Sequence, residues 1–366
     1  MTEPDPALFR DNETMLDAAS QPTTIEIGDF LTDSGNVVPS ARVAVQSFGE
    51  RRGDNNVLVC HALTGDANVE GWWGRLAGSG KALDTDGFHL IGTNLLGGCS
   101  GSTGPATLDP DGRPLGSRFP VLTVGDQVRA MALALDAMGI ERLHAVVGGS
   151  TGAFHALEWA RRFPERVGRV VSTAGAARQG ALHIALNEIG RQAIMRDPKW
   201  RGGDYPLDDP PRDGLAVARM IGHVGYLSGE ALERKFGRAL QERERFAFTL
   251  DIEFAVESYL RHQATKFTER FDANAYLILT RAANYFDLTH YPQSGPPCTF
   301  IAFASDTLYP PSASEEAASI VRTSGAKAEV VVCSCPWGHD SFLLDDGEQA
   351  DAIRRALDRA QSQWVE

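Results

Sequence analysis

The sequence lacks long hydrophobic runs and any excess of positive charge. No segment approaches the ~20 apolar residues that a membrane-spanning helix needs. Met1 to Ser20 is polar and acid-rich, without the apolar centre of a secretory signal peptide. The formal net charge of −13 is unfavourable for binding nucleic acid or an anionic membrane. The sequence therefore predicts a cytoplasmic protein that binds neither membranes nor nucleic acids.

Cysteine is scarce, and no metal or phosphate motif is present. The five cysteines are Cys60, Cys99, Cys298, Cys333 and Cys335. An odd count without a secretory signal predicts reduced, buried thiols. Cys333 and Cys335 lack metal-ligand spacing and fit the alternation of a strand better. Without a phosphate-loop signature either, we expect no metal and no tightly bound cofactor.

Strand-like and helix-like segments alternate over most of the chain. An antiparallel hairpin is predicted within Thr23 to Phe48, around the turn Asp33-Ser34-Gly35-Asn36. The predicted strands after it are Asn56–Cys60, Phe88–Thr93, Leu143–Val147, Val167–Ser172, Cys298–Ala304 and Ala328–Cys333. The predicted helices between and after them are Val124–Met138, Ala153–Phe163, Ser312–Thr323 and Gln349–Trp364. This alternation predicts an α/β fold, a mostly parallel sheet covered by helices on both faces.

The middle of the chain breaks this alternation. From Arg178 to Pro297 the predicted elements are all helical: Ala181–Arg196, Gly214–Leu227, Glu230–Phe236, Glu253–Phe267 and Asn274–Phe286. We interpret residues 178–297 as a helical lid inserted into one core domain, residues 1–177 and 298–366.

The segment Val146-Val147-Gly148-Gly149-Ser150-Thr151-Gly152 joins a predicted strand to a predicted helix. Gly-x-Ser-x-Gly in this context is typical of a nucleophile elbow, in which glycines let strand and helix approach closely and the serine hydroxyl is exposed. A glycine-rich structural loop is the alternative, but the strand–turn–helix context favours Ser150 as a nucleophile.

A serine needs a base and an acid that orients the base. In the α/β-hydrolase fold these follow the serine in the order acid, then histidine, at the carboxyl ends of later strands. Asp306 and His339 occupy those places. Asp340 and Asp345 are rival acids, but Asp340 adjoins His339 and an immediate neighbour seldom reaches the same imidazole.

Two backbone amides are candidates for an oxyanion hole. Thr151 directly follows the nucleophile, and Leu63 follows the predicted strand that ends at Cys60. Amides in these two places bind the developing oxyanion in α/β hydrolases. Core packing is the alternative role for Leu63.

Beyond these motifs, the chain resembles homoserine O-acetyltransferases from about residue 23 onward. The segments that carry the resemblance are Cys60–Asp66, Gly71–Trp73, Asn94–Pro105, Gly148–Ser150, Asn187–Glu188, Arg191–Met195, Trp200–Tyr205, Ala218–His223, Tyr226–Ser228, Val256–Leu260 and Gly338–Leu343. Two positions depart from the family pattern: Thr151 stands where Met is usual, and Ala153-Phe154 replaces a glycine-rich continuation. These changes affect the walls of the acyl pocket rather than the backbone amide.

The resemblance implies ping-pong transfer of an acetyl group from acetyl-CoA, through Ser150, to L-homoserine for methionine biosynthesis. It also implies that Arg219 binds the substrate carboxylate, with Tyr226 nearby, and that Asp340 faces the amino group. A guanidinium matches a carboxylate and an aspartate matches an ammonium. A homodimer that pairs through lid helices is a further expectation from the family.

Three alternatives stay open from the residues. A serine esterase or other hydrolase would use the same triad. Transfer of a succinyl group is another alternative, and so is transfer to L-serine, which differs from L-homoserine by one methylene worth only ~1–3 kcal/mol in a pocket. A non-enzymatic binding module would be expected to lack part of the triad, whereas this sequence contains all of it.

Overall fold

The computed structural model describes residues 22–344 and 347–360. The loose arm expected for residues 1–20 and the end of the last predicted helix lie outside these ranges. In the described ranges no helix is long and apolar enough to cross a membrane. The five cysteines all lie in these ranges and form no disulfide, and all except Cys99 are buried.

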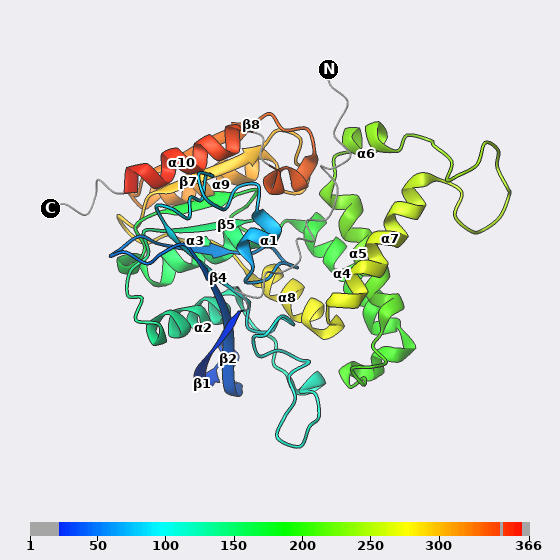
Figure 1. Ribbon diagram of the computed structural model, residues 1–366, viewed down its shortest axis with the longest axis horizontal. Coiled ribbons are helices and arrows are strands. Elements are labelled where there is room, and N and C mark those ends of the chain that lie inside the picture. Colours follow the sequence, from blue (N-terminus) through cyan, green and yellow to red (C-terminus); the bar gives the residue numbers. More distant parts are fainter. Residues whose placement is uncertain (1–21, 345–346, 361–366) are drawn as a thin grey trace.

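An eight-stranded sheet forms the core of the molecule (Figure 1). Its strands are β1 (Thr23–Leu31), β2 (Val37–Phe48), β3 (Asn56–Cys60), β4 (His89–Thr93), β5 (Ala145–Gly149), β6 (Val170–Thr173), β7 (Cys298–Phe303) and β8 (Ala328–Cys333). Their order is β1-β2-β4-β3-β5-β6-β7-β8. β1 pairs antiparallel with β2, and β2 with β4; every later pair is parallel. The structure confirms the edge hairpin and the mostly parallel sheet.

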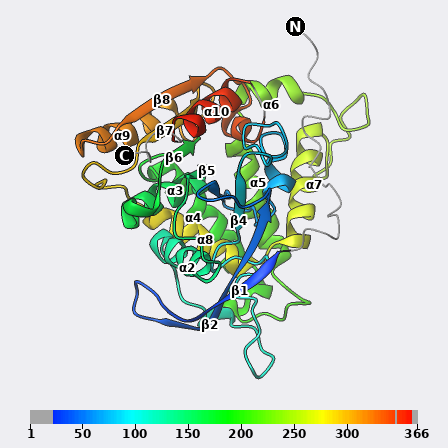
Figure 2. The same cartoon turned by 60° about the vertical axis from the view of Figure 1, so that its left-hand side comes forward.

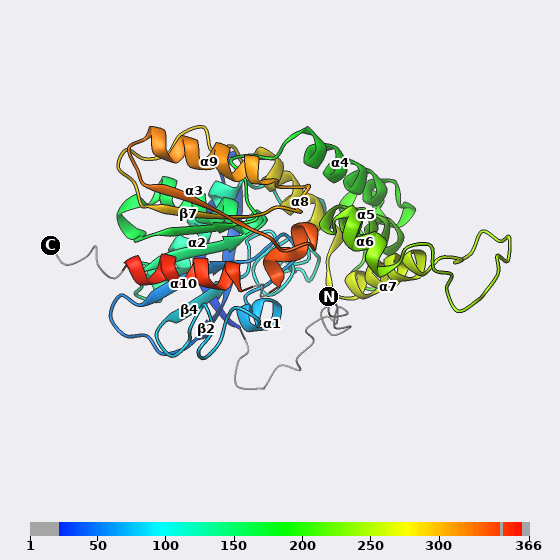
Figure 3. The same cartoon turned by 90° about the horizontal axis from the view of Figure 1, so that it is seen from above.

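Helices cover both faces of the sheet, and residues along β5 alternate between two apolar clusters. Val146 belongs to the cluster under α2 (Val124–Ala137), α3 (Thr151–Arg162) and α9 (Pro311–Thr323). Ala145 and Val147 belong to the cluster under α1 (Val69–Trp73) and α10 (Glu348–Ala360). Figure 3 shows α9 and α10 on opposite sides of the sheet. A strand buried on both faces explains why these runs are continuously apolar rather than alternating.

The chain between β6 and β7 is helical. It forms α4 (Ala181–Arg196), the 3-10 turn η4 (Pro198–Gly203), α5 (Arg212–Tyr226), α6 (Gly229–Lys235), α7 (Ala255–Arg270) and α8 (Ala273–Tyr285). Figures 1 and 3 show α4, α5 and α7 beside the sheet, and Figure 2 shows α7 at one side of the molecule. After α8, Phe286 stacks on Phe154 of α3 with ring centres 4.6 Å apart. Because this end of the insertion also packs on the core, the division at residues 178 and 297 stays a prediction.

The strand that precedes Ser150 lies two residues later than predicted. Leu143 makes only an isolated bridge with Val167, while β5 runs from Ala145 through Gly149. Glycine disfavours strands locally, but parallel pairing of Gly148 with Cys60 and of Gly149 with Thr173 holds both in the sheet. Helix α3 correspondingly begins at Thr151, not Ala153. Ser150 therefore directly follows the last residue of β5 and directly precedes the first residue of α3.

Candidate active site

Ser150 occupies a strained position between β5 and α3. Its backbone has φ +57°, a left-handed value that is rare outside glycine. An added Cβ at Gly148 would lie 2.1 Å from the Gly152 carbonyl oxygen, and one at Gly152 would lie 2.1 Å from that of Cys60. Glycine is thus required at both ends of the Gly-x-Ser-x-Gly motif. The close approach presses the start of α3 against the end of β3.

The structure brings Ser150, His339 and Asp306 together in one hydrogen-bonded chain. His339 Nε2 lies 2.7 Å from Ser150 Oγ, and His339 Nδ1 lies 2.8 Å from Asp306 Oδ2. All three residues are buried. His339 follows β8 in the 3-10 turn η5 (Gly338–Leu343), and Asp306 follows β7. This is the geometry of a nucleophile, a base and an orienting acid.

The acid is held by its own loop. Asp306 Oδ1 accepts hydrogen bonds from the backbone N–H groups of Leu308 and Tyr309, at 2.8 and 2.9 Å. Its other oxygen is left to face the imidazole. The rival Asp340 makes no hydrogen bond to His339 within the described residues, and Asp345 lies outside them.

The environment favours a proton on His339. Burial alone lowers the pKa of His339, but the charge and hydrogen bond of Asp306, with the charge of Asp340, raise that pKa above its ordinary value. A base with a raised pKa takes the serine proton more readily, provided that it is unprotonated beforehand.

Two amides near Ser150 lack internal partners. Over the described part of the chain, neither the Thr151 nor the Leu63 backbone N–H donates to a protein acceptor. Thr151 is the first residue of α3, where helical N–H groups have no partner in the helix. Leu63 lies just beyond β3, which Gly152 contacts. This placement is compatible with the predicted oxyanion hole.

Arg219 lies on the lid helix α5 with its charge over aromatic rings. Its guanidinium carbon is 4.7 Å from the ring centre of Phe267 and 5.8 Å from that of Tyr226. Its Nη1 is 3.5 Å from Thr64 Oγ1, and its Nε is buried without a partner. No carboxylate among the described residues forms an ion pair with it. The guanidinium therefore has a donor, Nε, available to an anion.

Tyr226 contacts both Arg219 and His339, and Asp340 interacts electrostatically with the same two residues. The rings of Tyr226 and His339 are 6.2 Å apart. Burial and the charge of Asp340 raise the pKa of Tyr226, against the effect of Arg219. Burial also raises the pKa of Asp340, while the positive charges of His339 and Arg219 oppose that rise. All three predicted substrate residues thus act electrostatically on one another beside the imidazole.

Two residues beside the candidate site, His183 and Ser305, were not predicted from the sequence. His183 stacks on Tyr309 with ring centres 4.3 Å apart, and Tyr309 lies beside the His339 ring with ring centres 5.3 Å apart. Burial and the charge of His339 lower the pKa of His183 to about 4. Ser305 bridges the loops of the acid and the base, and its only signal in the sequence was its place directly before Asp306.

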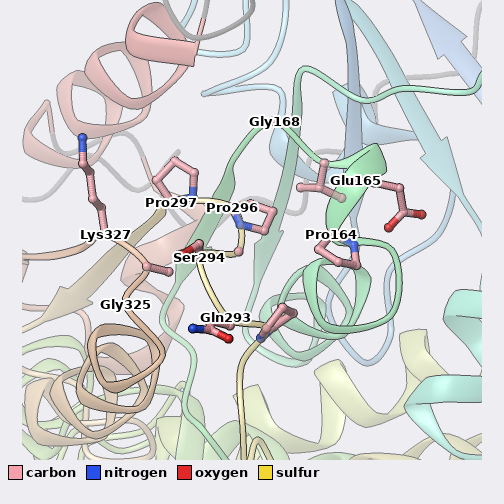
Figure 4. Close-up of a pocket in the computed structure, with 13 residues that line it drawn as sticks. Pro164, Glu165, Gly168, Gln293, Ser294, Pro296, Pro297, Gly325 and Lys327 are labelled. Carbon is pink, nitrogen blue, oxygen red and sulfur yellow. The ribbon is translucent and has the colours of Figure 1, made fainter.

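A separate cavity of about 510 Å³ lies at the opposite end of the sheet (Figure 4). Its lining includes Gly168 before β6, Pro297 before β7 and Lys327 before β8. These are the amino ends of parallel strands, whereas Ser150, Asp306 and His339 follow the carboxyl ends. None of the predicted site residues lines it, so the cavity is not the catalytic site. No group of three or more His, Cys, Asp or Glu side chains in the described ranges could hold a metal ion.

Comparisons with known proteins agree with this geometry. A family model described as alpha/beta hydrolase fold matches residues 55–345. A homoserine O-acetyltransferase of Rhodospirillum rubrum is 45% identical, covering 94% of this chain and 95% of that protein.

Two solved structures have the same fold. Esterase E22 is 27% identical with a TM-score of 0.84, covering 92% of this chain and 100% of that chain. Homoserine O-acetyltransferase from Bacillus anthracis is 23% identical with a TM-score of 0.84, covering 93% of this chain and 98% of that chain. By its family match and its identity to full-length relatives, the chain belongs to the homoserine O-acetyltransferase family, within the α/β-hydrolase fold.

Proposed function

We propose that this chain is an L-homoserine O-acetyltransferase that works through an acetyl-serine intermediate. The observation that carries the proposal is the pairing of two features in one site. The first is the hydrogen-bonded chain from Ser150 through His339 to Asp306. The second is a cation, Arg219, and an anion, Asp340, beside that chain. A triad alone supports any acyl transfer, but a triad facing both charges suits a zwitterionic amino acid as acceptor.

In the first half-reaction, His339 Nε2 takes the hydroxyl proton while Ser150 Oγ attacks the thioester carbonyl carbon. The oxyanion that forms is bound by the amides of Thr151 and Leu63. The carbon–sulfur bond then breaks, and the imidazolium returns its proton to the departing thiolate. Free CoA leaves, and the acetyl group remains as an ester on Ser150. Acetyl-CoA is thus a co-substrate and not a resident cofactor.

In the second half-reaction, the homoserine hydroxyl takes the place of the thiol. His339 Nε2 removes its proton, the oxygen attacks the acetyl-serine carbonyl, and the ester bond to Ser150 Oγ breaks. The proton then passes from His339 to Ser150, giving O-acetyl-L-homoserine and free enzyme. Arg219 would bind the carboxylate of the amino acid, with Tyr226 beside it, and Asp340 would bind the ammonium.

Transfer requires that water be kept from the ester. Water is present at roughly 55 M, so the acceptor must be held in a site from which water is excluded. Tyr226 of the lid and Tyr309 of the acid loop place rings beside His339, and Phe267 covers the guanidinium of Arg219. These rings would exclude water from the acetyl-serine. A serine esterase is the second candidate function, because esterase E22 has a closely similar fold.

A matrix of acyl-CoA donors and amino-alcohol acceptors, read by release of free thiol, separates these functions. We expect turnover with acetyl-CoA that depends on L-homoserine, with succinyl-CoA and L-serine weaker. Turnover of p-nitrophenyl acetate or acetyl-CoA that is indifferent to homoserine would instead identify an esterase.

The nucleotide end of CoA needs positive charge, although the chain as a whole carries −13. Three cations fall within five residues at the end of α6 and just beyond it. Arg234 lies over Trp337 at 4.3 Å, Lys235 over Tyr259 at 4.3 Å and Arg238 over Phe254 at 5.4 Å. Trp337 is two residues before His339, and the charge of Lys235 acts on Asp340. We propose that the phosphates of acetyl-CoA bind beside Arg234, Lys235 and Arg238.

Exposed apolar residues on the lid support a homodimer. Leu182 and Ile189 on α4, and Val217 and Val224 on α5, are each seven residues apart and each about half exposed. Residues at this spacing share one face of a helix. We propose that a second copy covers these faces in the cytoplasm, where this biosynthetic step takes place. A Leu182→Asp, Val224→Asp double variant that stays dimeric by light scattering would exclude this interface.

A further inference from the structure

The loop that carries the catalytic histidine is held by two serines from different parts of the fold. Ser305, directly before Asp306, donates from Oγ to the Cys335 carbonyl oxygen at 2.6 Å. The same Oγ accepts the backbone N–H of Gly338 at 2.9 Å. The Ser305 hydroxyl therefore holds residues 335–338 against the loop that contains Asp306.

The second serine comes from the lid. Ser228 caps helix α6 by accepting the Ala231 N–H at 3.0 Å, and it donates from Oγ to the Pro336 carbonyl oxygen at 2.9 Å. Ser228 is buried, so water does not readily replace this bond. The cap of a lid helix and the loop of the histidine thus share one side chain.

Backbone packing leaves this contact little freedom. Gly338 has φ +74°, and a Cβ added there would lie 2.3 Å from the Ser228 nitrogen and 3.0 Å from the Tyr226 carbonyl oxygen. The junction of α5 and α6 therefore lies directly against the residue before His339. Tyr226, a proposed substrate contact, belongs to that junction.

We propose that Ser305 and Ser228 are positioning residues for His339. Ser305 sets the histidine loop against Asp306, and Ser228 sets it against the lid. By this link, the position of the lid determines whether the imidazole is aligned between Asp306 and Ser150. The inference extends the proposed function, because it assigns to the lid a part in aligning the base as well as in binding the acceptor.

The test measures acylation separately from transfer. Ser305→Ala and Ser228→Ala are compared with Ser305→Thr and Ser228→Thr, which keep the hydroxyl. Ser314→Ala is the matched control, since Ser314 is also buried but bonds the Gly175 carbonyl oxygen, away from the histidine loop. Rapid mixing with p-nitrophenyl acetate reports the acylation burst, and thermal melting reports stability.

We expect Ser305→Ala to slow the burst by about 10- to 100-fold with little change in KM. In Ser305→Ala the pH at which the burst rate rises should be lower than in wild type, because the Asp306 charge no longer acts fully on the imidazole and the pKa of His339 falls. Ser228→Ala should slow the burst less and divert more acetyl-enzyme to water. The threonine variants should recover most of the rate, and Ser314→Ala should alter only the melting temperature.

Wild-type burst rates and pH profiles in both alanine variants would overturn the proposal, as would losses that merely follow melting temperature. If Ser305→Ala does not fold, the Ser228 pair decides the outcome alone. A wild-type enzyme that shows the burst but no transfer to homoserine would refute the proposed acceptor and leave the positioning role testable.

Discussion

Arg219 and Asp340 act on each other's charge without forming an ion pair in the described structure. The positive charge of Arg219 opposes the rise that burial causes in the pKa of Asp340. Arg219 instead lies against aromatic rings, which favour a cation without neutralising it. Opposite charges that are not paired with each other suit a ligand that carries both charges, as an amino acid does.

Arg219→Gln should weaken the acceptor half-reaction. A lost charge-assisted hydrogen bond corresponds to about a 10- to 100-fold rise in the KM for homoserine. The thiol burst with acetyl-CoA alone should remain near wild type. Arg201→Gln is the control, since Arg201 is exposed and paired with Asp209 at 2.8 Å. An equal loss in both half-reactions would mean that Arg219 supports the fold or the donor.

Ser150→Ala should abolish release of thiol from acetyl-CoA. Mass spectrometry of wild-type protein quenched with donor alone should find one acetyl group on the peptide that contains Ser150. The exposed Ser79→Ala variant should behave as wild type. Near wild-type transfer by Ser150→Ala would refute the covalent mechanism.

The pH dependence of acylation should report His339. The base must be unprotonated to accept the serine proton, so the burst rate rises with pH through the pKa of His339 and then levels off. Because Asp306 and Asp340 raise that pKa, the rise should lie above the pH expected for an ordinary histidine.

The Asp306→Asn variant tests the same assignment. In Asp306→Asn the burst rate should rise at a lower pH than in wild type, and its plateau at high pH should be reduced by about 10⁴-fold, since the imidazole loses its orienting acid. Asp351→Asn, at an exposed carboxylate paired with Arg354, serves as control. If the burst rate of Asp306→Asn rises at the same pH as that of wild type, the group that titrates is not His339.

The cations of α6 can be tested with two donors that differ only in the nucleotide. Arg234→Gln and Lys235→Gln should raise the KM for acetyl-CoA about tenfold each and weaken its salt dependence. The KM for S-acetyl-pantetheine, which lacks the phosphates, should not change. Equal effects on both donors would place the phosphates elsewhere.

The hydrogen-bonded chain of Ser150, His339 and Asp306 was predictable because each of these residues has a local signal in the sequence. Gly148 and Gly152 mark the elbow, and the close approaches in the structure show why no other residue fits there. Asp306 and His339 follow strands whose apolar runs are plain in the sequence. The chain order of serine, acid and histidine then needs only the topology of a parallel sheet.

The two-residue shift of β5 was not predictable from local preference. Gly148 and Gly149 join the strand because β3 and β6 supply hydrogen-bonding partners on either side. The strand propensity of a residue does not include the effect of such neighbouring strands. For the same reason the sequence could not reveal Ser305 and Ser228 as a pair, since 77 positions separate residues that the fold brings to one loop.

The sequence by itself determined the fold class and the family, and it led to the proposal of Ser150, Asp306 and His339 as nucleophile, acid and base, because apolar periodicity and glycine-dependent turns are local properties. Only the tertiary structure decided how those groups are held. It set Asp306 on two backbone amides, gave Arg219 no ion pair within residues 22–344 and 347–360, and joined the lid to the histidine loop at Gly338. Hydrogen bonds and charge effects depend on distances between segments remote in the chain, and those distances exist only once the sheet and the lid have packed.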